Sequence, residues 1–207
     1  MSTTKQLKGV ILVSFEFPPR RLSKMSDEVE KIAKFLSKEK IKTWVITFDD
    51  WRSGIEKIND FLIIHRIPYP VPNNISFLAM IMNLKPAYQS VIASILHSSK
   101  IDLIHLFDWT TLPIIIPWKN ELKVKTVLSL PNLQILRDSA TSPYNQGIKK
   151  IELLGMETVT KIIVPSKEVA SSIKKHYNIN ENKITIVSQK EKKFSEKISE
   201  IYNEIIV

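Results

Sequence analysis

The side chains with the clearest capacity for chemistry lie in one stretch, Asp102–Trp109. A short apolar run, Leu103–Leu106, leads there into Phe107, Asp108 and Trp109. Open α/β sheets bind their ligands beyond the carboxyl ends of strands, so an acid and an aromatic at that position indicate a ligand site. The same residues also fit a plain strand followed by an aspartate that caps the next helix. From this stretch alone, both interpretations stay open.

Three arginines outside this stretch are the best candidates for binding an anion. Arg20, Arg21 and Arg137 lie in segments expected to be loops, which should open at one edge of the predicted sheet. His105 lies inside an apolar strand, where the pattern fits a hydrogen-bonded core histidine as well as a catalytic one. The chain has no nucleophile elbow or phosphate-loop motif, and its four histidines lack metal-ligand spacing. We therefore predict no catalytic residue, no metal site and no cofactor.

Apolar runs of strand length alternate with helical patterns along the chain. The runs cover residues 9–15, 42–48, 61–66, 102–106, 125–130, 161–165 and 183–187. Because these runs are unbroken, they indicate a parallel sheet covered by helices on both faces. The predicted fold class is therefore α/β, with about six to seven parallel strands.

Some local features between these runs are also predicted. Residues 49–59 are expected to form a polar connection, and Ser26 is expected to cap the first helix. Pro86 is expected to break or kink the helix predicted over residues 75–98. Residues 131–146 are expected to form the longest irregular stretch.

Composition is that of an ordinary globular protein. The chain has 207 residues, 43% of them hydrophobic, which is enough for one well-buried α/β domain. It has no cysteine, which excludes disulfides and thiolate metal sites. The first residues carry no signal-peptide core, and no apolar run approaches the ~20 residues of a membrane span. A cytoplasmic protein with no transmembrane segment is therefore expected.

The formal net charge is +9. This basic balance favours an anionic partner such as a sugar phosphate, a nucleic acid or a membrane surface, and a solubility charge spread over the surface fits it equally well. A nucleic-acid recognition motif is absent, so no specific nucleic acid is expected as a partner.

Four stretches together resemble one known family. They are Ser14–Pro19, Asp102–Trp109, Lys125–Asn132, and the segment from Glu152 to Ser166. In this order they resemble the N-terminal, acceptor-side domain of GT-B glycosyltransferases, in the group of glycogen and starch synthases and retaining family-4 enzymes. The resemblance implies a Rossmann-like single GT-B half-domain. It implies a glycan or a nucleotide-sugar as ligand.

The resemblance and the loop positions together select a set of candidate ligand-binding residues. The set is Arg20, Arg21, Lys24, His105, Asp108, Trp109, Asn132, Arg137 and Ser166. Asp108 would either orient a sugar hydroxyl or cap the following helix.

The chain also departs from the family pattern. Ser23 and Lys24 stand where the family has the glycines that let backbone N–H groups approach a sugar-nucleotide phosphate, and Ser26 replaces a later glycine. Phe107 replaces the histidine that contacts the transferred sugar, and phenylalanine offers no hydrogen bond. Pro131 replaces the histidine of the third stretch. These departures argue against catalysis by this chain.

The C-terminal end allows two interpretations. Phe194–Ile206 resembles the helix with which the family's chain crosses back onto the N-terminal domain, which suggests that a donor domain has been deleted between Gln189 and Lys193. An unrelated amphipathic helix fits equally well. We expect residues 1–189 to form the Rossmann-like domain and residues 190–207 to pack back on it as a helix.

The expected function is that of a glycosyltransferase-like protein, inactive as an isolated chain, that binds a glycan, a nucleotide or a protein partner. The alternative is an acceptor-binding subunit of a split glycosyltransferase whose donor domain is a separate chain. Whether the protein is an enzyme stays open. A protein partner or a second copy would bind at the carboxyl edge of the sheet through an apolar patch, unless residues 131–146 fold over it. The patch would comprise Phe17, Pro18, Pro19, Phe107, Trp109 and Pro131.

Overall fold

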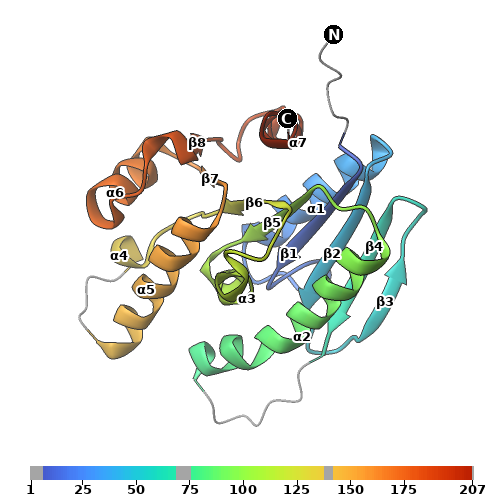
Figure 1. Ribbon diagram of the computed structural model, residues 1–207, viewed down its shortest axis with the longest axis horizontal. Coiled ribbons are helices and arrows are strands. Elements are labelled where there is room, and N and C mark those ends of the chain that lie inside the picture. Colours follow the sequence, from blue (N-terminus) through green and yellow to red (C-terminus); the bar gives the residue numbers. More distant parts are fainter. Residues whose placement is uncertain (1–6, 69–75, 138–141, 207) are drawn as a thin grey trace.

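The computed structural model describes residues 7–68, 76–137 and 142–206. Within these residues eight strands form one sheet (Figure 1). The strands are β1 (Gly9–Ser14), β2 (Lys42–Phe48), β3 (Gly54–Lys57), β4 (Leu62–Ile67), β5 (Leu103–Phe107), β6 (Lys125–Ser129), β7 (Lys161–Val164) and β8 (Ile184–Ile186). Their order in the sheet is β3-β4-β2-β1-β5-β6-β7-β8, and every pairing except that of β3 with β4 is parallel.

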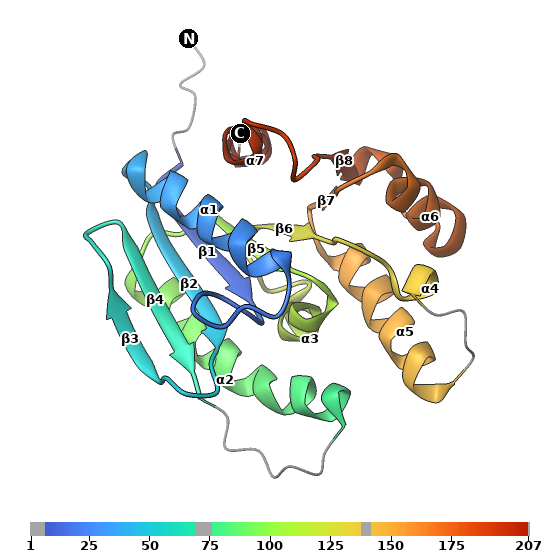
Figure 2. The ribbon, with the colours of Figure 1, turned by 180° about the vertical axis from the view of Figure 1, so that it is seen from behind.

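Helices cover both faces of this sheet (Figures 1 and 2). They are α1 (Lys24–Lys38), α2 (Phe77–Ser98), α3 (Leu112–Ile115), α4 (Gln134–Arg137), α5 (Pro143–Thr158), α6 (Lys167–Tyr177) and α7 (Phe194–Ile206). Three short 3-10 turns lie at Trp109–Thr111, Ile116–Trp118 and Glu181–Lys183. Residues of α1 and α7 pack in the core on one face, and residues of α2, α3, α5 and α6 pack in the core on the other. The predicted α/β sandwich is confirmed.

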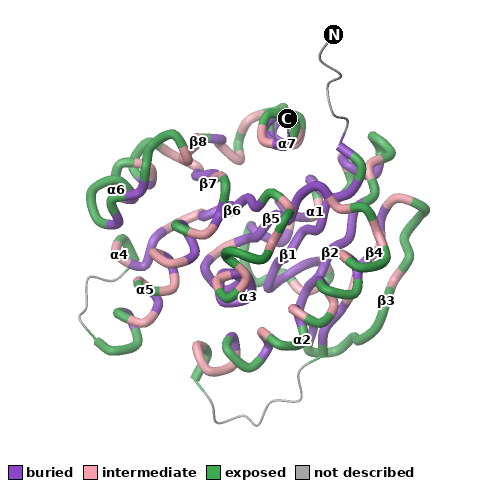
Figure 3. Tube along the Cα trace, in the orientation of Figure 1, coloured by how far each residue is buried: buried purple, intermediate pink, exposed green. Residues whose placement is uncertain are grey.

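The central strands are buried on both faces, as Figure 3 shows. Alternate residues of β1 point to opposite cores, because side chains in a strand alternate between the two faces of the sheet. Val10 and Leu12 join the core under α1 and α7, whereas Ile11 and Val13 join the core under α2. Both faces must therefore be apolar, which explains the unbroken apolar run.

The strand order creates a crevice at one place. Without β3, the order runs outward from β1 to β2 and β4 on one side, and to β5 and the later strands on the other. This is the order of a doubly wound Rossmann-like sheet, which reverses direction between β1 and β5. The helices that follow β1 and β5 leave on opposite faces, so the loops after these two strands diverge. The crevice between them is where such folds bind ligands.

Three local predictions are corrected by the structure. Residues 49–59 include a short strand, β3, which pairs antiparallel with β4 at the sheet edge. Its side chains are mostly exposed, so no apolar pattern marks it. It is held by backbone pairing with β4 and by the contact of Glu56 with Arg66. Of the break or kink predicted at Pro86, the break does not occur, because helix α2 continues through this residue. The stretch over residues 131–146 contains α4 and the start of α5, and its residues 138–141 lie outside the described part.

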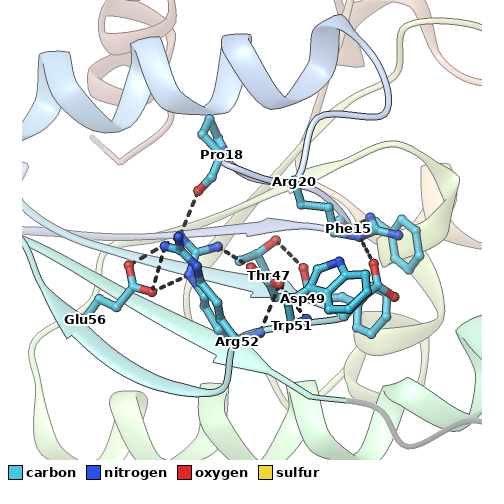
Figure 4. Close-up of polar contacts among 11 residues, drawn as sticks. Phe15, Pro18, Arg20, Thr47, Asp49, Trp51, Arg52 and Glu56 are labelled. Atoms are coloured by element: carbon cyan, nitrogen blue, oxygen red, sulfur yellow. Dashed lines mark hydrogen bonds and ion pairs between the residues drawn. The ribbon is translucent and has the colours of Figure 1, made fainter.

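A buried arginine holds the loop after β1 against the neighbouring strands (Figure 4). Arg66 of β4 donates from Nη1 to Asp49 Oδ2 at 2.9 Å and from Nε to Glu56 Oε1 at 2.6 Å. Its Nη2 donates to the backbone carbonyl of Pro18 at 2.7 Å. A buried guanidinium is tolerated when its donors are satisfied in this way. This cluster therefore fixes the path of the loop that leads toward the crevice.

Helix α7 closes the face that α1 leaves uncovered. Its apolar stripe packs beside α1 in the same core. The Tyr202 hydroxyl is hydrogen-bonded to Nδ1 of His105 in β5, so the helix is also joined to the central sheet by a polar contact. None of the helices in the described part of the chain has the length and apolarity of a membrane span.

Candidate functional site

A cavity of about 600 Å³ lies at the carboxyl ends of β1, β5 and β6. Its walls come from the loop after β1, the first turns of α1, the loops after β5 and β6, helices α4 and α5, and Gln189. The cavity therefore occupies the crevice that the strand order creates. Its polar lining includes Glu16, Glu28, Asp108, Asn132, Gln134 and Arg137.

Glu16 closes one wall by binding the turn in front of α1. Its carboxylate accepts hydrogen bonds from the backbone N–H groups of Leu22, at 2.5 Å, and Ser23, at 2.8 Å. The Ser23 hydroxyl donates to the same carboxylate. Ser23 in turn caps α1 by accepting from the Met25 N–H at 3.0 Å, so the cap lies three residues before the predicted one at Ser26. A carboxylate thus satisfies two backbone N–H groups of the turn that leads into the positive end of α1.

Glu28, on the second turn of α1, is a buried carboxyl group that lines the cavity. The residue is 7% exposed, and it has no hydrogen bond or ion pair with any residue that the structure describes. Fully buried side-chain oxygens without a partner do not occur in the described chain, so the remaining exposed area of Glu28 includes its carboxyl. Burial raises the pKa of Glu28 to about 7, opposed by Lys31 and assisted by Glu16 and Asp27.

Asp108 holds an unusual backbone conformation at the end of β5. Its φ of 66° and ψ of 167° lie in a region that is essentially limited to glycine, so the backbone is strained at this aspartate. The turn is secured because its N–H donates to Ser129 O at 2.9 Å and its carbonyl accepts from Thr111 N at 3.2 Å. The carboxylate makes no helix-cap hydrogen bond and instead accepts from Arg137 Nη2 at 3.4 Å. Burial raises the pKa of Asp108, and Arg137 partly offsets this. Asp108 therefore stands at the N-cap position of the turn Trp109–Thr111, as predicted, but its side chain does not make the capping hydrogen bond.

Glu152 of α5 holds the loop after β6 in place through hydrogen bonds. This carboxylate is completely buried and accepts from the Gln134 N–H at 2.8 Å and from the Tyr177 hydroxyl. Gln134 also donates from Nε2 to Asn145 Oδ1 at 3.0 Å. Burial is the main cause that raises the pKa of Glu152. The wall that presents Asn132 to the cavity is therefore built on a buried polar network.

The predicted apolar patch is not formed. Phe17, Phe107 and Trp109 are 5%, 1% and 3% exposed. The first turn of α2 reaches over this region, and the Phe77 ring packs edge-on against Trp109 at 5.9 Å between centroids. Aromatic rings in such contact are core material, so Trp109 contributes only part of one face to the cavity wall.

The structure brings five of the nine predicted site residues to this cavity. They are Lys24, Asp108, Trp109, Asn132 and Arg137. The four others lie elsewhere in the molecule.

Two of those four are arginines with partners of their own. Arg20 lies over the rings of Phe15 and Phe48, at 4.6 Å from each, and donates to Asp50 at 2.8 Å. Arg21 is exposed and pairs with two acids of α1, Asp27 and Glu30, on the outer side of the helix. Neither arginine is at the cavity.

The other two predicted site residues stabilise the fold and do not reach the cavity. His105 is completely buried and bonded to Tyr202 and, at 2.8 Å, to the Ser129 hydroxyl. Burial lowers the pKa of His105 to about 3, so it is a neutral core histidine. Ser166 caps α6 by accepting from the Val169 N–H at 3.3 Å, as the helix pattern predicted.

Sequence reasoning missed the two acids that shape the cavity. Glu28 follows Met25 by three residues and precedes Ile32 by four, so it lies on the apolar stripe of α1. An acid at such a position is a signal that could have been recognised. Glu16 carries no such signal, because its partners depend on how the loop folds back.

Comparisons with known proteins agree with this geometry. Residues 29–189 match the sequence family Glycosyltransferase Family 4. The fold resembles a chain of sucrose-phosphate synthase from Thermosynechococcus elongatus described by the ranges 27–220 and 406–426 (TM-score 0.72, 9% identity, covering 97% of this chain and 100% of that chain). A longer chain of the same synthase gives a TM-score of 0.73 at 10% identity, covering 87% of this chain and 48% of that one.

Starch synthase IV from Arabidopsis thaliana, solved with ADP and acarbose, is also similar in fold (TM-score 0.63, 11% identity, covering 88% and 52%). The present chain spans about half the length of these longer chains. A comparison with curated protein sequences gives no match. At such low identities the structures establish the fold, which is that of one GT-B half-domain, and the sequence match over most of the chain establishes the family. This protein belongs to Glycosyltransferase Family 4.

Proposed function

We propose that this chain is a glycosyltransferase-like protein that binds a saccharide in the cavity and transfers no glycosyl group by itself. A cavity of about 600 Å³ with a few convergent polar groups is typical of a small-molecule site. Asp108, Asn132 and Gln134 offer the acceptors and donors that sugar hydroxyls need. The complex of starch synthase IV with ADP and acarbose supports a nucleotide or a saccharide as ligand class.

One observation carries the non-catalytic part of the proposal: the Glu16 carboxylate already occupies the backbone N–H groups of Leu22 and Ser23. Family resemblance implies that this turn would approach the phosphate of a sugar nucleotide. A phosphate placed there would have to displace a bound carboxylate and lie near Glu28 as well, and like charges in a partly buried site repel strongly. Phe107, which replaces a hydrogen-bonding histidine of the family, supports the same conclusion.

The C-terminal helix fits an acceptor-side half-domain. Residues 1–189 would form that half and residues 190–207 its returning helix. The sucrose-phosphate synthase chain that matches over its whole length is described by one long range and one later short range, which supports this division. The packing of α7 against α1 gives the helix a physical role, because it covers apolar residues of the sheet.

The cavity at the crevice, with its polar side chains, also supports a second candidate function. The acceptor-binding half of a split glycosyltransferase would keep Asp108, Asn132 and Arg137 at the crevice and receive its donor domain as a separate chain. That protein partner would meet the sheet at its carboxyl edge. This alternative predicts turnover only when a donor-binding chain is added.

The test is a titration of the purified chain with maltotriose, glucose, UDP-glucose and ADP-glucose, followed by calorimetry and ligand-observed NMR. We expect saturable binding of a saccharide that Asn132→Ala and Arg137→Ala each weaken. Asn182→Ala is the matched control, because Asn182 is exposed and precedes β8 at the opposite edge of the sheet. The absence of any saccharide binding would refute the proposal. Sustained turnover of a nucleotide sugar by the chain alone would refute its non-catalytic part.

A further inference from the structure

We propose that the cavity wall formed by Glu16 and Glu28 recognises a protonated amine, so that the preferred saccharide is an amino sugar rather than a neutral sugar or a sugar phosphate. This inference rests on the proposed function and names the ligand class of the same site. It follows from three observations: the position of Glu28, the hydrogen bonds that already engage the Glu16 carboxylate, and the charged groups around the cavity.

The first step is the carboxyl group without a partner. The carboxyl of Glu28 reaches the surface of the cavity, so it is open to a ligand although most of the side chain is buried. Glu28 is more than nine-tenths buried, and no described residue bonds to its carboxyl. A donor group of a ligand in the cavity would supply the missing bond.

The second step concerns the groups that surround Glu28. On its own helix, Asp27 and Lys31 act on it with opposite signs, and across the turn Glu16 adds a second negative charge. The residues that the loop after β6 and α7 bring beside Glu28 include Pro131 and Phe194, which carry no charge. Two other acids, Glu16 and Asp27, therefore lie near Glu28 together with one base, Lys31, so an ammonium group placed at this wall would have three carboxyl groups around it.

The third step concerns the rest of the cavity. The acids Glu16, Glu28 and Asp108 face two bases, Lys24 and Arg137. Arg137 is already paired with Asp108 at 3.4 Å, and Lys24 is exposed at the start of α1. Neither of these two bases pairs with Glu28, and the base that acts on it is Lys31 of the same helix. A phosphate would meet repulsion there, whereas an ammonium group would gain a charge-assisted hydrogen bond.

The experiment compares glucosamine, N-acetylglucosamine and glucose by NMR titration of the whole chain at pH 7. These three sugars differ at one position, where an ammonium, a neutral amide and a hydroxyl take each other's place. We expect glucosamine to bind tighter than the other two by roughly tenfold or more, because a hydrogen bond to a charged group contributes about that factor. Glu28→Gln should remove this preference, so that glucosamine and glucose bind the variant with affinities within about twofold of each other.

Glu30→Gln is the matched control. Glu30 lies on the same helix but pairs with Arg21 and Lys34 outside the cavity, so this variant should keep the preference. Circular dichroism of both variants checks that they fold. If Glu28→Gln does not fold, the relative affinities of the three sugars for the unaltered chain still show whether an ammonium group is preferred.

Each outcome bears on the inference. Equal binding of glucosamine and glucose overturns it and leaves the proposed saccharide site standing. A preference that survives Glu28→Gln also overturns it, as does tighter binding of glucose 6-phosphate than of glucose. Failure of every saccharide, including maltotriose, overturns both this inference and the proposed function.

Discussion

Replacing Glu28 by glutamine should make the protein more stable at alkaline pH and leave it unchanged in acid. The pKa of Glu28 is about 7 in the folded chain, against 4.5 for an ordinary glutamate, because burial disfavours its charged form. The folded state therefore holds the proton more tightly than the unfolded state. Stability from this group is fully present below pH 4.5 and is lost as the pH rises through 7.

The size of the effect follows from the same two values. A folded pKa of about 7 in place of 4.5 corresponds to roughly 3 kcal/mol above pH 7. Glu28→Gln should therefore unfold with a free energy about 3 kcal/mol larger than that of the unaltered chain at pH 8, and with the same free energy at pH 4. His105, whose pKa is lowered to about 3, makes both proteins less stable as the pH falls below 6.5. This second effect cancels in the difference between the two.

Urea unfolding followed by tryptophan fluorescence, at pH values from 4 to 8, measures that difference. Glu200→Gln, an exposed position on α7, is the control and should give a difference near zero at every pH. A Glu28→Gln variant that is less stable at pH 8 would refute the reasoning, because it would mean that the carboxylate has a stabilising partner. A gain that does not depend on pH would refute it as well.

Two further predictions concern packing and polar contacts. Gly155→Ala should destabilise the chain by about 1–3 kcal/mol, because a Cβ would lie 2.5–2.8 Å from three side-chain carbons of Leu112. Gly147→Ala on the same helix, where the nearest atom would be 3.5 Å away, should stabilise it by about 0.5–1 kcal/mol, and equal melting temperatures for the two variants would contradict this. Tyr202→Phe should cost about 1–3 kcal/mol in urea unfolding, because it removes a hydrogen-bond partner of the buried His105. An unchanged unfolding free energy would show that this contact contributes nothing.

Local sequence patterns determined the secondary structure and the fold class. The unbroken apolar runs at β1 and β5 require a sheet covered on both faces, and the stripe of α1 requires a helix packed on it. The place of the site was predictable too, because Asp108 follows a central strand and the carboxyl ends of such strands line the crevice. The edge strand β3 could not be predicted in the same way, since its exposed side chains carry no pattern.

Only the tertiary structure decided which charged groups face the cavity. The sequence did not distinguish Arg20 and Arg21 from Arg137. The loop after β1 folds so that the first two pair with acids at the surface, and of the three only Arg137 reaches the cavity. Glu16 bonds to the turn before α1 because that loop doubles back on itself over six to seven residues. These contacts depend on backbone paths through space, and side-chain types and spacing do not encode such paths locally.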